Sequence, residues 1–365
     1  MNIKYVDLGA QWTEIRDEAL PEIDKVLQSG MYLEHPIVSE LERKLETYLN
    51  VENVVTLNSG TDALILGLVA LGVKSGDEII TVPNSFIASV AAIEHVGAKT
   101  VFVDVAEDHL IDPQKIENAI TSKTAGIMPV HLEGKMADMP TIKKIADKYG
   151  LKIIEDAAQA FGSHINGQMP GSNSDISCFS LHPLKNLNAL GDGGFIATKN
   201  KDIAERISIL RTHGQKLRNV SDEFGVVSRL DSIQAAVLNI KLNYLNSTIL
   251  RRRNFAAMYD AKLKNLNLKL PEVKSNIFHS YHLYVIEVED RDRVQAYLAK
   301  AGIETKIHYP TLISDQLAFT KKYQNSDFDI TNARAQSKKI LSLPIHQNLN
   351  EESIEYVATK IQEAL

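Results

Sequence analysis

The chain has 365 residues, of which 44% are hydrophobic and 24% charged, and its formal net charge is −6. A chain of this length exceeds the size at which a single hydrophobic core stops growing, so two subdomains are expected. The negative charge predicts no nucleic-acid partner and no anionic membrane partner. The main basic cluster, Arg251–Arg253, lies in a helical pattern, and a solvated helix face explains it better than a binding patch.

The N-terminal segment "MNIKYVDLGAQW" lacks the apolar run of a signal peptide, and no segment approaches the length that spans a bilayer. The single cysteine, Cys178, alternates with Ser177 and Phe179 in a strand-like run, which is typical of a core thiol in a reducing compartment. A nucleophilic cysteine is disfavoured because no base partner is evident. We therefore expect a cytoplasmic protein.

Short apolar runs alternate with helical patterns over the first part of the chain. Such an alternation is typical of an α/β layered domain, and continuous apolar runs are typical of parallel strands buried on both faces. We therefore expect a large domain over residues 1–240 with a largely parallel sheet. The predicted strands are 54–57, 78–83, 100–105, 125–131, 151–160, 176–181 and 194–199.

The pattern changes after about residue 240. A long helical stretch at 246–265 is followed by an apolar run at 281–288, a helix at 290–301 and a helix-rich tail. We expect a smaller α+β domain over residues 241–365, without internal repeats.

Polar side chains follow several predicted strands, at the edge of the sheet where ligands bind in open α/β folds. Ser59, Gly60 and Thr61 precede an apolar helix, and the free N–H groups of that helix would suit a phosphate. A plain Ser/Thr N-cap is the alternative and, taken alone, the better one. Neither a Walker A motif nor G-x-G-x-x-G is present, which disfavours nucleoside triphosphates and a nicotinamide-dependent oxidoreductase.

Three further turns each contain a side chain that could bind part of one ligand. Asp156 follows the strand "LKII" and could pair with a cationic ring nitrogen or, equally well, cap a helix. Phe86 could stack on a flat ring, although a core position is the better interpretation for this residue alone. Lys185 lies in an uncharged turn, where a desolvated amine has a lowered pKa and can form a Schiff base. A phosphate cup, a carboxylate, an aromatic ring and such a lysine are what pyridoxal 5'-phosphate requires.

The whole chain resembles the sugar aminotransferases of the DegT/DnrJ/EryC1/StrS family. The resemblance runs through "SGTDAL", "GDEIITVPNSFIAS", "IMPVHLEGKMADM", "IIEDAAQAFG", "CFSLHPLKNL", "GDGG", "SRLDSIQAAVLNIKL", "HYP" and "LSLPIH". It implies the type I (aspartate aminotransferase) fold, with a mostly parallel seven-stranded sheet and a smaller C-terminal α+β domain. It also implies the cofactor contacts: Lys185 as the Schiff base, Asp156 on the pyridine nitrogen, Phe86 against the ring, Gln159 at the ring hydroxyl, and Gly60, Thr61 and Ser180 at the phosphate.

The resemblance further implies a reaction. The amino group of L-glutamate moves onto a keto group, with C3 expected, of a nucleotide-linked ketosugar, for amino sugars of O-antigen, lipopolysaccharide or another surface glycan. Amination at C4 and a pyridoxal-phosphate-dependent sugar dehydratase are the alternatives. A sugar 3-dehydratase of this family carries histidine in place of the lysine, so Lys185 argues against that reaction. A catalytically inactive binding or regulatory subunit is a further alternative, and the retained Lys185 and Asp156 argue against it.

Substrate contacts follow from the same resemblance. His308 and Tyr309, in "KIHYP", match a segment that lines the sugar site, although a plain turn before Pro310 explains them equally well. Arg229 could reach a substrate diphosphate across a dimer interface, with a structural salt bridge as its rival. A homodimer is expected because the active site of this family is built from two subunits.

Two positions depart from the family pattern. Val227 stands where an asparagine usually reaches the cofactor phosphate of the neighbouring subunit, and valine cannot donate a hydrogen bond. His35 stands where glycine is common.

His131, Glu133 and Glu155 lie near the expected crevice, but their spacing fits no standard metal signature, so no metal is expected.

Overall fold

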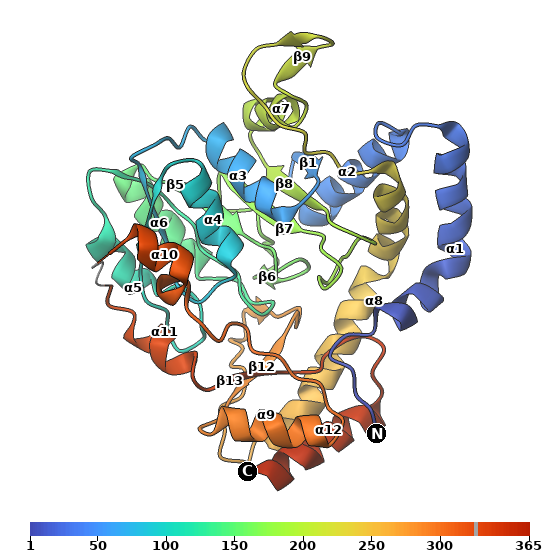
Figure 1. The fold of residues 1–365 in the computed structure, drawn as a ribbon, viewed down its shortest axis with the longest axis vertical. Helices are drawn as coiled ribbons and strands as arrows, with labels where there is room; N and C mark the ends of the chain where they lie inside the picture. Colours follow the sequence, from blue (N-terminus) through green and yellow to red (C-terminus); the bar gives the residue numbers. More distant parts are fainter. Residues whose placement is uncertain (325–327) are drawn as a thin grey trace.

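The computed structural model describes residues 1–324 and 328–365, and its large domain is built on one seven-stranded sheet (Figure 1). The strand order is β1-β8-β7-β5-β4-β2-β3. Only β8 runs antiparallel to its neighbours, which confirms the predicted, mostly parallel seven-stranded sheet. The strands are β1 (Asn53–Leu57), β2 (Glu78–Thr81), β3 (Lys99–Phe102), β4 (Thr124–Ile127), β5 (Lys152–Asp156), β7 (Ile176–Ser180) and β8 (Gly194–Thr198).

Helices cover both faces of this sheet, which is why its strands are apolar on both sides. Cys178 and Ile196 pack with the helices of one face, whereas Phe179 and Phe195 pack with those of the other. The thiol of Cys178 is buried and donates to the carbonyl of Ala63, so the predicted core position is confirmed. The first face carries α3 (Gly60–Ala70), α4 (Ile87–His95) and α7 (Lys201–Leu210), and the second carries α2 (Pro36–Leu49) and the start of α8 (Ser232–Leu263).

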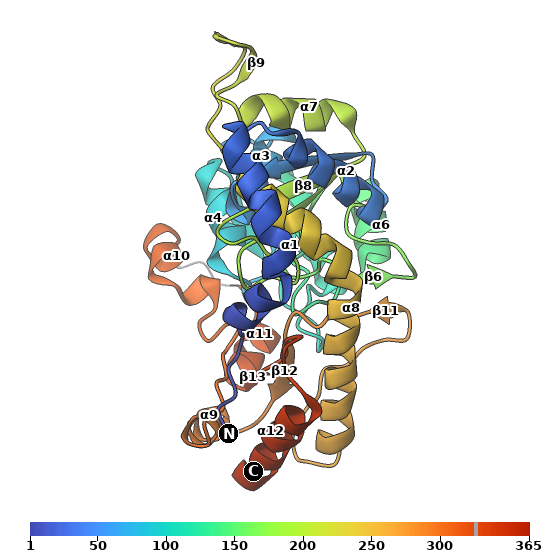
Figure 2. The same cartoon turned by 90° about the vertical axis from the view of Figure 1, so that its right-hand side faces the viewer.

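The 32-residue helix α8 joins the large domain to the small one (Figures 1 and 2). It begins at Ser232, earlier than the predicted stretch 246–265. It is packed between other elements, so Arg252 is buried, whereas Arg251 is exposed. The predicted solvated face is therefore wrong for Arg252, whose Nη1 donates to the carbonyl of Ile345 at 2.8 Å.

The small domain is organised around the antiparallel pair β12 (Tyr284–Glu287) and β13 (Ile340–Leu343). The helices α9 (Arg291–Lys300) and α12 (Glu351–Ala364) pack in the same core as these strands. Ile3 belongs to that core and pairs with Ile303. In contrast, Phe319 of α10 (Leu317–Lys322) packs with Phe102 of the large domain. The division at residue 240 remains a prediction, because α8 continues through it.

Several elements had no counterpart in the sequence analysis. The N-terminal helix α1 (Leu8–Ser29) contains Pro21 and packs along α8. The hairpin of β9 (Gln215–Leu217) and β10 (Val220–Ser221) projects from the body of the molecule (Figure 2). Within the described part of the chain, no helix is both long and apolar enough to cross a bilayer. The remaining elements are α5 (Pro113–Ile116), the 3-10 turns Glu117–Ala119 and Ile313–Asp315, α6 (Met139–Tyr149), β6 (His164–Ile165), β11 (Ile277–Phe278) and α11 (Thr331–Gln336).

Replacing Phe179 by alanine should destabilise the sheet. Phe179 is 1% exposed, and its ring stacks on that of Phe195 with centroids 4.5 Å apart. We expect Phe179→Ala to lower the free energy of unfolding by about 3–5 kcal/mol, because it removes buried apolar surface and leaves a cavity. Leu250→Ala, on the exposed face of α8, should change it by less than about 0.5 kcal/mol. Denaturant unfolding measures both changes. Equal decreases in the free energy of unfolding for the two variants would contradict this packing.

Candidate active site

The antiparallel strand β8 brings three turns to one edge of the sheet. Leu57 at the end of β1 and Ser180 at the end of β7 both pair with Gly194, the first residue of β8. Because β1 and β7 run the same way, their carboxyl ends meet at the edge where β8 begins. The turns that follow Leu57 and Ser180 therefore lie beside the "GDGG" segment that ends at Gly194.

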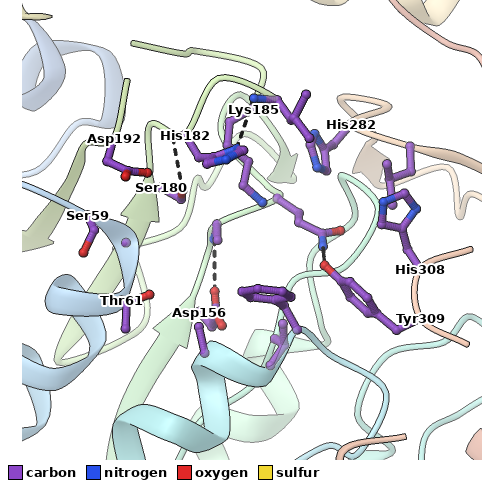
Figure 3. A pocket seen from close by; sticks show the side chains of 18 of the residues that line it. Ser59, Thr61, Asp156, Ser180, His182, Lys185, Asp192, His282, His308 and Tyr309 are labelled. Atoms are coloured by element: carbon purple, nitrogen blue, oxygen red, sulfur yellow. Dashed lines mark hydrogen bonds between the residues drawn. The ribbon is translucent and has the colours of Figure 1, made fainter. Parts of the chain in front are cut away.

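A cavity of about 390 Å³ opens at this edge (Figure 3). It extends to residues of the small domain, including His282 and Ile345. In Figure 3 the Lys185 side chain reaches into the space between Ser180 on one side and Tyr309 on the other. Every cofactor contact predicted from the sequence lines this cavity, as do two of the three predicted substrate residues: Gly60, Thr61, Phe86, Asp156, Gln159, Ser180, Lys185, His308 and Tyr309.

One end of the cavity is built from the first turn of α3. Ser59 caps the helix, its hydroxyl oxygen accepting from the N–H of Asp62 at 3.0 Å. A Cβ atom on Gly60 would lie 2.8 Å from Cβ of Ser180, and one on Gly194 would lie 2.4 Å from the carbonyl carbon of Ser59. Only glycines allow this approach. The result is a helix N-terminus with hydroxyl groups beside it, an arrangement that fits a phosphate group.

Asp156 is held as a hydrogen-bond acceptor at the end of β5. Its Oδ2 accepts from the Ser89 hydroxyl at 2.7 Å, and its Oδ1 accepts from the N–H of Ala158 at 3.2 Å. The side chain is 5% exposed and lines the cavity. A carboxylate fixed in this way is suited to a ring N–H, because the contacts with Ser89 and Ala158 orient it without supplying a positive charge.

Lys185 occupies a closed loop with a free amine at its tip. The loop is closed by the N–H of Ala189, which donates to the carbonyl of Leu181 at 2.8 Å. Lys241 of α8 braces it by donating to both oxygens of Asn188 at 2.9 Å. Burial lowers the pKa of Lys185 to about 8, an effect that the negative charge of Asp156 partly opposes. A substantial fraction of the amine is therefore neutral near physiological pH, as a nucleophile or base requires.

Gln159 connects the large domain to the small domain across the cavity. Its side-chain oxygen accepts from the N–H of Glu133 at 2.8 Å, and its amide nitrogen donates to the hydroxyl of Tyr309 at 3.2 Å (Figure 3). The ring of Phe86 lies 5.8 Å from that of Tyr309 and is 56% exposed. A core position for Phe86 is therefore wrong, and its ring is available to a ligand.

Some residues of the cavity were not predicted from the sequence. Asp192 lines the cavity and stands in "GDGG", directly before the glycines of the family motif, which was the available signal. Ser89 lies behind the cavity wall and acts through its hydrogen bond to Asp156. Tyr5 and Arg252 also line the cavity, and they come from the N-terminus and from α8. No local pattern announces these two, because only the path of the chain through the small domain brings them there.

Arg229 does not line the same cavity. It lies in an adjoining cavity of about 350 Å³, which shares Ser59 and Asp192 with the first. Its Nη1 is 3.8 Å from Oε1 of Glu34, and its substrate role remains a prediction. Val227 is exposed, beyond the hairpin of β9 and β10.

His35 caps α2, since its Nδ1 accepts from the N–H of Ile37 at 3.2 Å. Its structural role is therefore to end the loop before this helix.

The three residues considered for a metal site belong to two separate groups of side chains. Nε2 of His131 lies 2.6 Å from Oε2 of Glu155, while Glu133 contacts His109 and Lys135 instead. Among residues 1–324 and 328–365, no group of three His, Cys, Asp or Glu side chains is arranged to hold a metal ion.

Comparison with known proteins agrees with this geometry. The sequence model of the DegT/DnrJ/EryC1/StrS aminotransferase family matches residues 13–362. This chain belongs to that family. One relative, the UDP-N-acetyl-3-dehydro-α-D-glucosamine 3-aminotransferase of Acidithiobacillus ferrooxidans, is 39% identical over 100% of this chain and 98% of its own length.

Solved structures of family members superpose closely on the chain. DesV of S. venezuelae has a TM-score of 0.96 at 37% identity, covering 99% of this chain and 98% of its own. NtdA of Bacillus subtilis, solved with bound cofactor PMP, has a TM-score of 0.94 at 32% identity, covering 100% of this chain and 85% of its own. The protein is therefore a pyridoxal 5'-phosphate-dependent aminotransferase of the type I fold. Its α3 turn, Asp156 and Lys185 fit the phosphate, the ring nitrogen and the aldehyde of this cofactor.

The rate at which Lys185 bonds to added pyridoxal 5'-phosphate should rise as the pH increases through about 8. Only the neutral amine is nucleophilic, and burial lowers the pKa of Lys185 from 10.5 to about 8. Stopped-flow absorbance of the cofactor-free protein, between about pH 6 and pH 10, measures this rate. A midpoint near that of an exposed lysine would contradict the desolvated environment of Lys185.

Proposed function

We propose that this aminotransferase moves the amino group of L-glutamate onto keto carbon C3 of a nucleotide-linked ketosugar. The observation that carries the proposal is the free amine of Lys185, which shares one cavity with Asp156, His308 and Tyr309. The name of the Acidithiobacillus relative supports a nucleotide-linked substrate and position C3. Glutamate as the donor is implied by the family resemblance.

The residues of the large domain would divide the cofactor chemistry between them. Bound pyridoxal 5'-phosphate supplies an electron sink that makes the α-carbon of an amino acid acidic and allows the amino group to be carried between two substrates. Nζ of Lys185 would accept the proton from that α-carbon and later return it, since its pKa of about 8 suits both directions. Asp156, oriented by Ser89, would hold a proton on the ring nitrogen.

The small-domain side of the cavity offers uncharged hydrogen-bonding groups. Burial, together with the charge of Lys185, lowers the pKa of His308 to about 4, so the imidazole is neutral. Its Nδ1 is 2.9 Å from the hydroxyl of Ser342, and burial raises the pKa of the neighbouring Tyr309 phenol. Neutral donors and acceptors of this kind suit sugar hydroxyl and keto groups. Arg229, in the adjoining cavity, would take the diphosphate.

The active form is proposed to be a homodimer whose site is completed by the neighbouring subunit. Residues 215–224 form a projecting arm with large apolar side chains in solvent. Leu217 is 69% exposed, Val220 is 52% exposed and Phe224 is fully exposed. Apolar side chains gathered on one projecting segment favour contact with another protein surface, and a second copy of this chain is the occupant that the family implies.

We also propose that the enzyme works in the cytoplasm and makes an amino sugar for surface glycans such as lipopolysaccharide. The single buried and unpaired Cys178 supports a reducing compartment. The product class follows from the family resemblance, with the nucleotide serving as the carrier from which the sugar would be transferred to a glycan.

The donor half of the reaction tests the function directly. With cofactor, glutamate should give 2-oxoglutarate in a 1:1 ratio with enzyme and bleach the visible band of the lysine-bound cofactor. Lys185→Ala should form no such band and reduce the rate by at least about 100-fold, because the proton acceptor is lost. Lys152→Ala, on the protein surface, is the matched control.

The acceptor is then screened with nucleotide-linked 3-keto and 4-keto sugars, and NMR of the product identifies the aminated carbon. Amination at C4 would correct the position, whereas release of the amino group as ammonia would replace transfer by elimination. Failure of glutamate to bleach the cofactor band would overturn the proposed donor.

Phe224→Asp should weaken self-association. Phe224 is the most exposed large apolar residue of the arm, and a charge there would oppose burial against a second subunit. Sedimentation velocity should show dimers for the wild type and a shift toward monomers for the variant. Leu317→Asp, on exposed α10, should leave the dimer unchanged. A wild type that sediments as a monomer at micromolar concentration would contradict the proposal.

A further inference from the structure

Glu133 occupies a position for which the reaction itself gives no reason. It follows β4 and adopts a left-handed φ of 65°, a conformation that disfavours residues with a Cβ. The side chain is 4% exposed, so a carboxylate is buried in a strained loop. Such a combination persists only where the surroundings hold it in place.

Two cations hold the carboxylate. Oε1 of Glu133 lies 2.6 Å from Nδ1 of His109, and Oε2 lies 2.8 Å from Nζ of Lys135. Lys135 is itself buried, and its Nζ also donates to the carbonyl of Asp108 at 2.7 Å. Burial opposes ionisation of Glu133, but Lys135 and His109 outweigh it and lower the pKa of Glu133.

His109 extends this group into the small domain. Its Nε2 lies 3.2 Å from Oε1 of Glu287, at the end of β12, and Lys269 contacts the same oxygen at 3.3 Å. Both ring nitrogens of His109 therefore face carboxylate oxygens, which can only accept hydrogen bonds. Two donors on one imidazole require the protonated ring, so the geometry specifies a cation between Glu133 and Glu287. We call His109, Glu133, Lys135 and Glu287 the Glu133 clasp.

The backbone of the same loop adds to the link between domains. The carbonyl of Glu133 accepts from the N–H of Leu283 at 3.1 Å, and the carbonyl of Gly134 accepts from the N–H of Ser280 at 3.0 Å. A Cβ atom on Gly134 would lie 2.8 Å from the backbone nitrogen of Tyr281, so the two segments touch closely. The segment 280–283 leads directly into β12.

The other end of the clasp lies at the active site. The N–H of Glu133 donates to the side-chain oxygen of Gln159, which leaves the amide nitrogen of Gln159 directed at the hydroxyl of Tyr309. A rotation of the Glu133 peptide would remove this constraint on Gln159. The orientation of an active-site amide thus depends on the charges that hold Glu133.

We propose that the Glu133 clasp is a positioning device, in which the protonated His109 holds the small domain against the large one and thereby fixes Gln159 for the reaction. This proposal deepens the proposed function and rests on it for the role of Gln159. His109, Glu133 and Lys135 do not touch the substrate in this proposal, and they act through Gln159 and through the segment 280–283.

A direct test is the pH dependence of amide exchange at Leu283. The carboxylates outweigh the effect of burial and raise the pKa of His109 from 6.5 to about 8. The stabilisation is therefore complete below about pH 6.5 and is lost as the pH rises through about 8. The groups that face His109 are Glu133 and Lys135 from the loop after β4, and Glu287 from β12.

Hydrogen exchange of the protein without substrate should show a protection factor at Leu283 that falls by about 10- to 30-fold across this range. In His109→Asn, where asparagine tolerates the left-handed backbone, protection at every pH should equal the low value that the wild type reaches at high pH. His95→Asn, at the exposed end of α4, is the control and should follow the wild type. Equal protection in the wild type and His109→Asn at low pH would overturn the clasp.

Glu287→Gln provides a second variant should His109→Asn fail to fold. Removing one carboxylate should move the midpoint of the protection profile to lower pH, while protection at Leu283 should still fall as the pH rises. An unchanged midpoint would overturn the role of Glu287. In the amine-transfer assay with saturating cofactor, His109→Asn should lower kcat by about 10-fold. If the wild type transferred no amino group, the proposed function would fail while the exchange result would still decide the clasp.

Discussion

The insertion of β8 between β1 and β7 is the constraint on which the site depends. Because β8 runs opposite to both neighbours, its first residue, Gly194, lies at the edge where those strands end. The start of α3, the loop of Lys185 and the "GDGG" turn are thereby compressed into one corner. A parallel strand in this place would put its amino end at the opposite edge, and the phosphate-binding turn would lose one wall.

The second requirement is a dry space for Lys185. The strand-end turns provide only part of its walls, and the small domain supplies the rest through His282, His308 and Tyr309. Desolvation then lowers the pKa of the lysine, so its chemistry is a property of the two-domain assembly. The same closure buries groups such as Arg252 and Glu133, whose charges must be balanced by carbonyls or by opposite charges.

The fold class and the cofactor side of the cavity could be predicted from the sequence, whereas less of the small domain could. Asp156, Ser180 and Gly60 could be placed because each follows or begins an apolar element, and parallel strands bring such positions together. Tyr5 and Arg252 could not be placed, since they approach from segments distant in sequence. The same limitation explains the wrong interpretation of Arg252, because periodicity shows that a run is helical but not which of its residues meets another domain.

The N-terminal segment sets an order of events during synthesis. Ile3 donates to the carbonyl of Gly302 and accepts from the N–H of Glu304, and the nearby Tyr5 lines the cavity. The strands of the large sheet all precede residue 199, so all of them have been synthesised while the small domain is still being made. The first residues of the chain must wait for partners that emerge some 300 residues later. At that stage a nascent chain has every strand of the sheet but an open, wet cavity, and Lys185 would have the properties of an ordinary surface amine until the last part of the protein has folded over it.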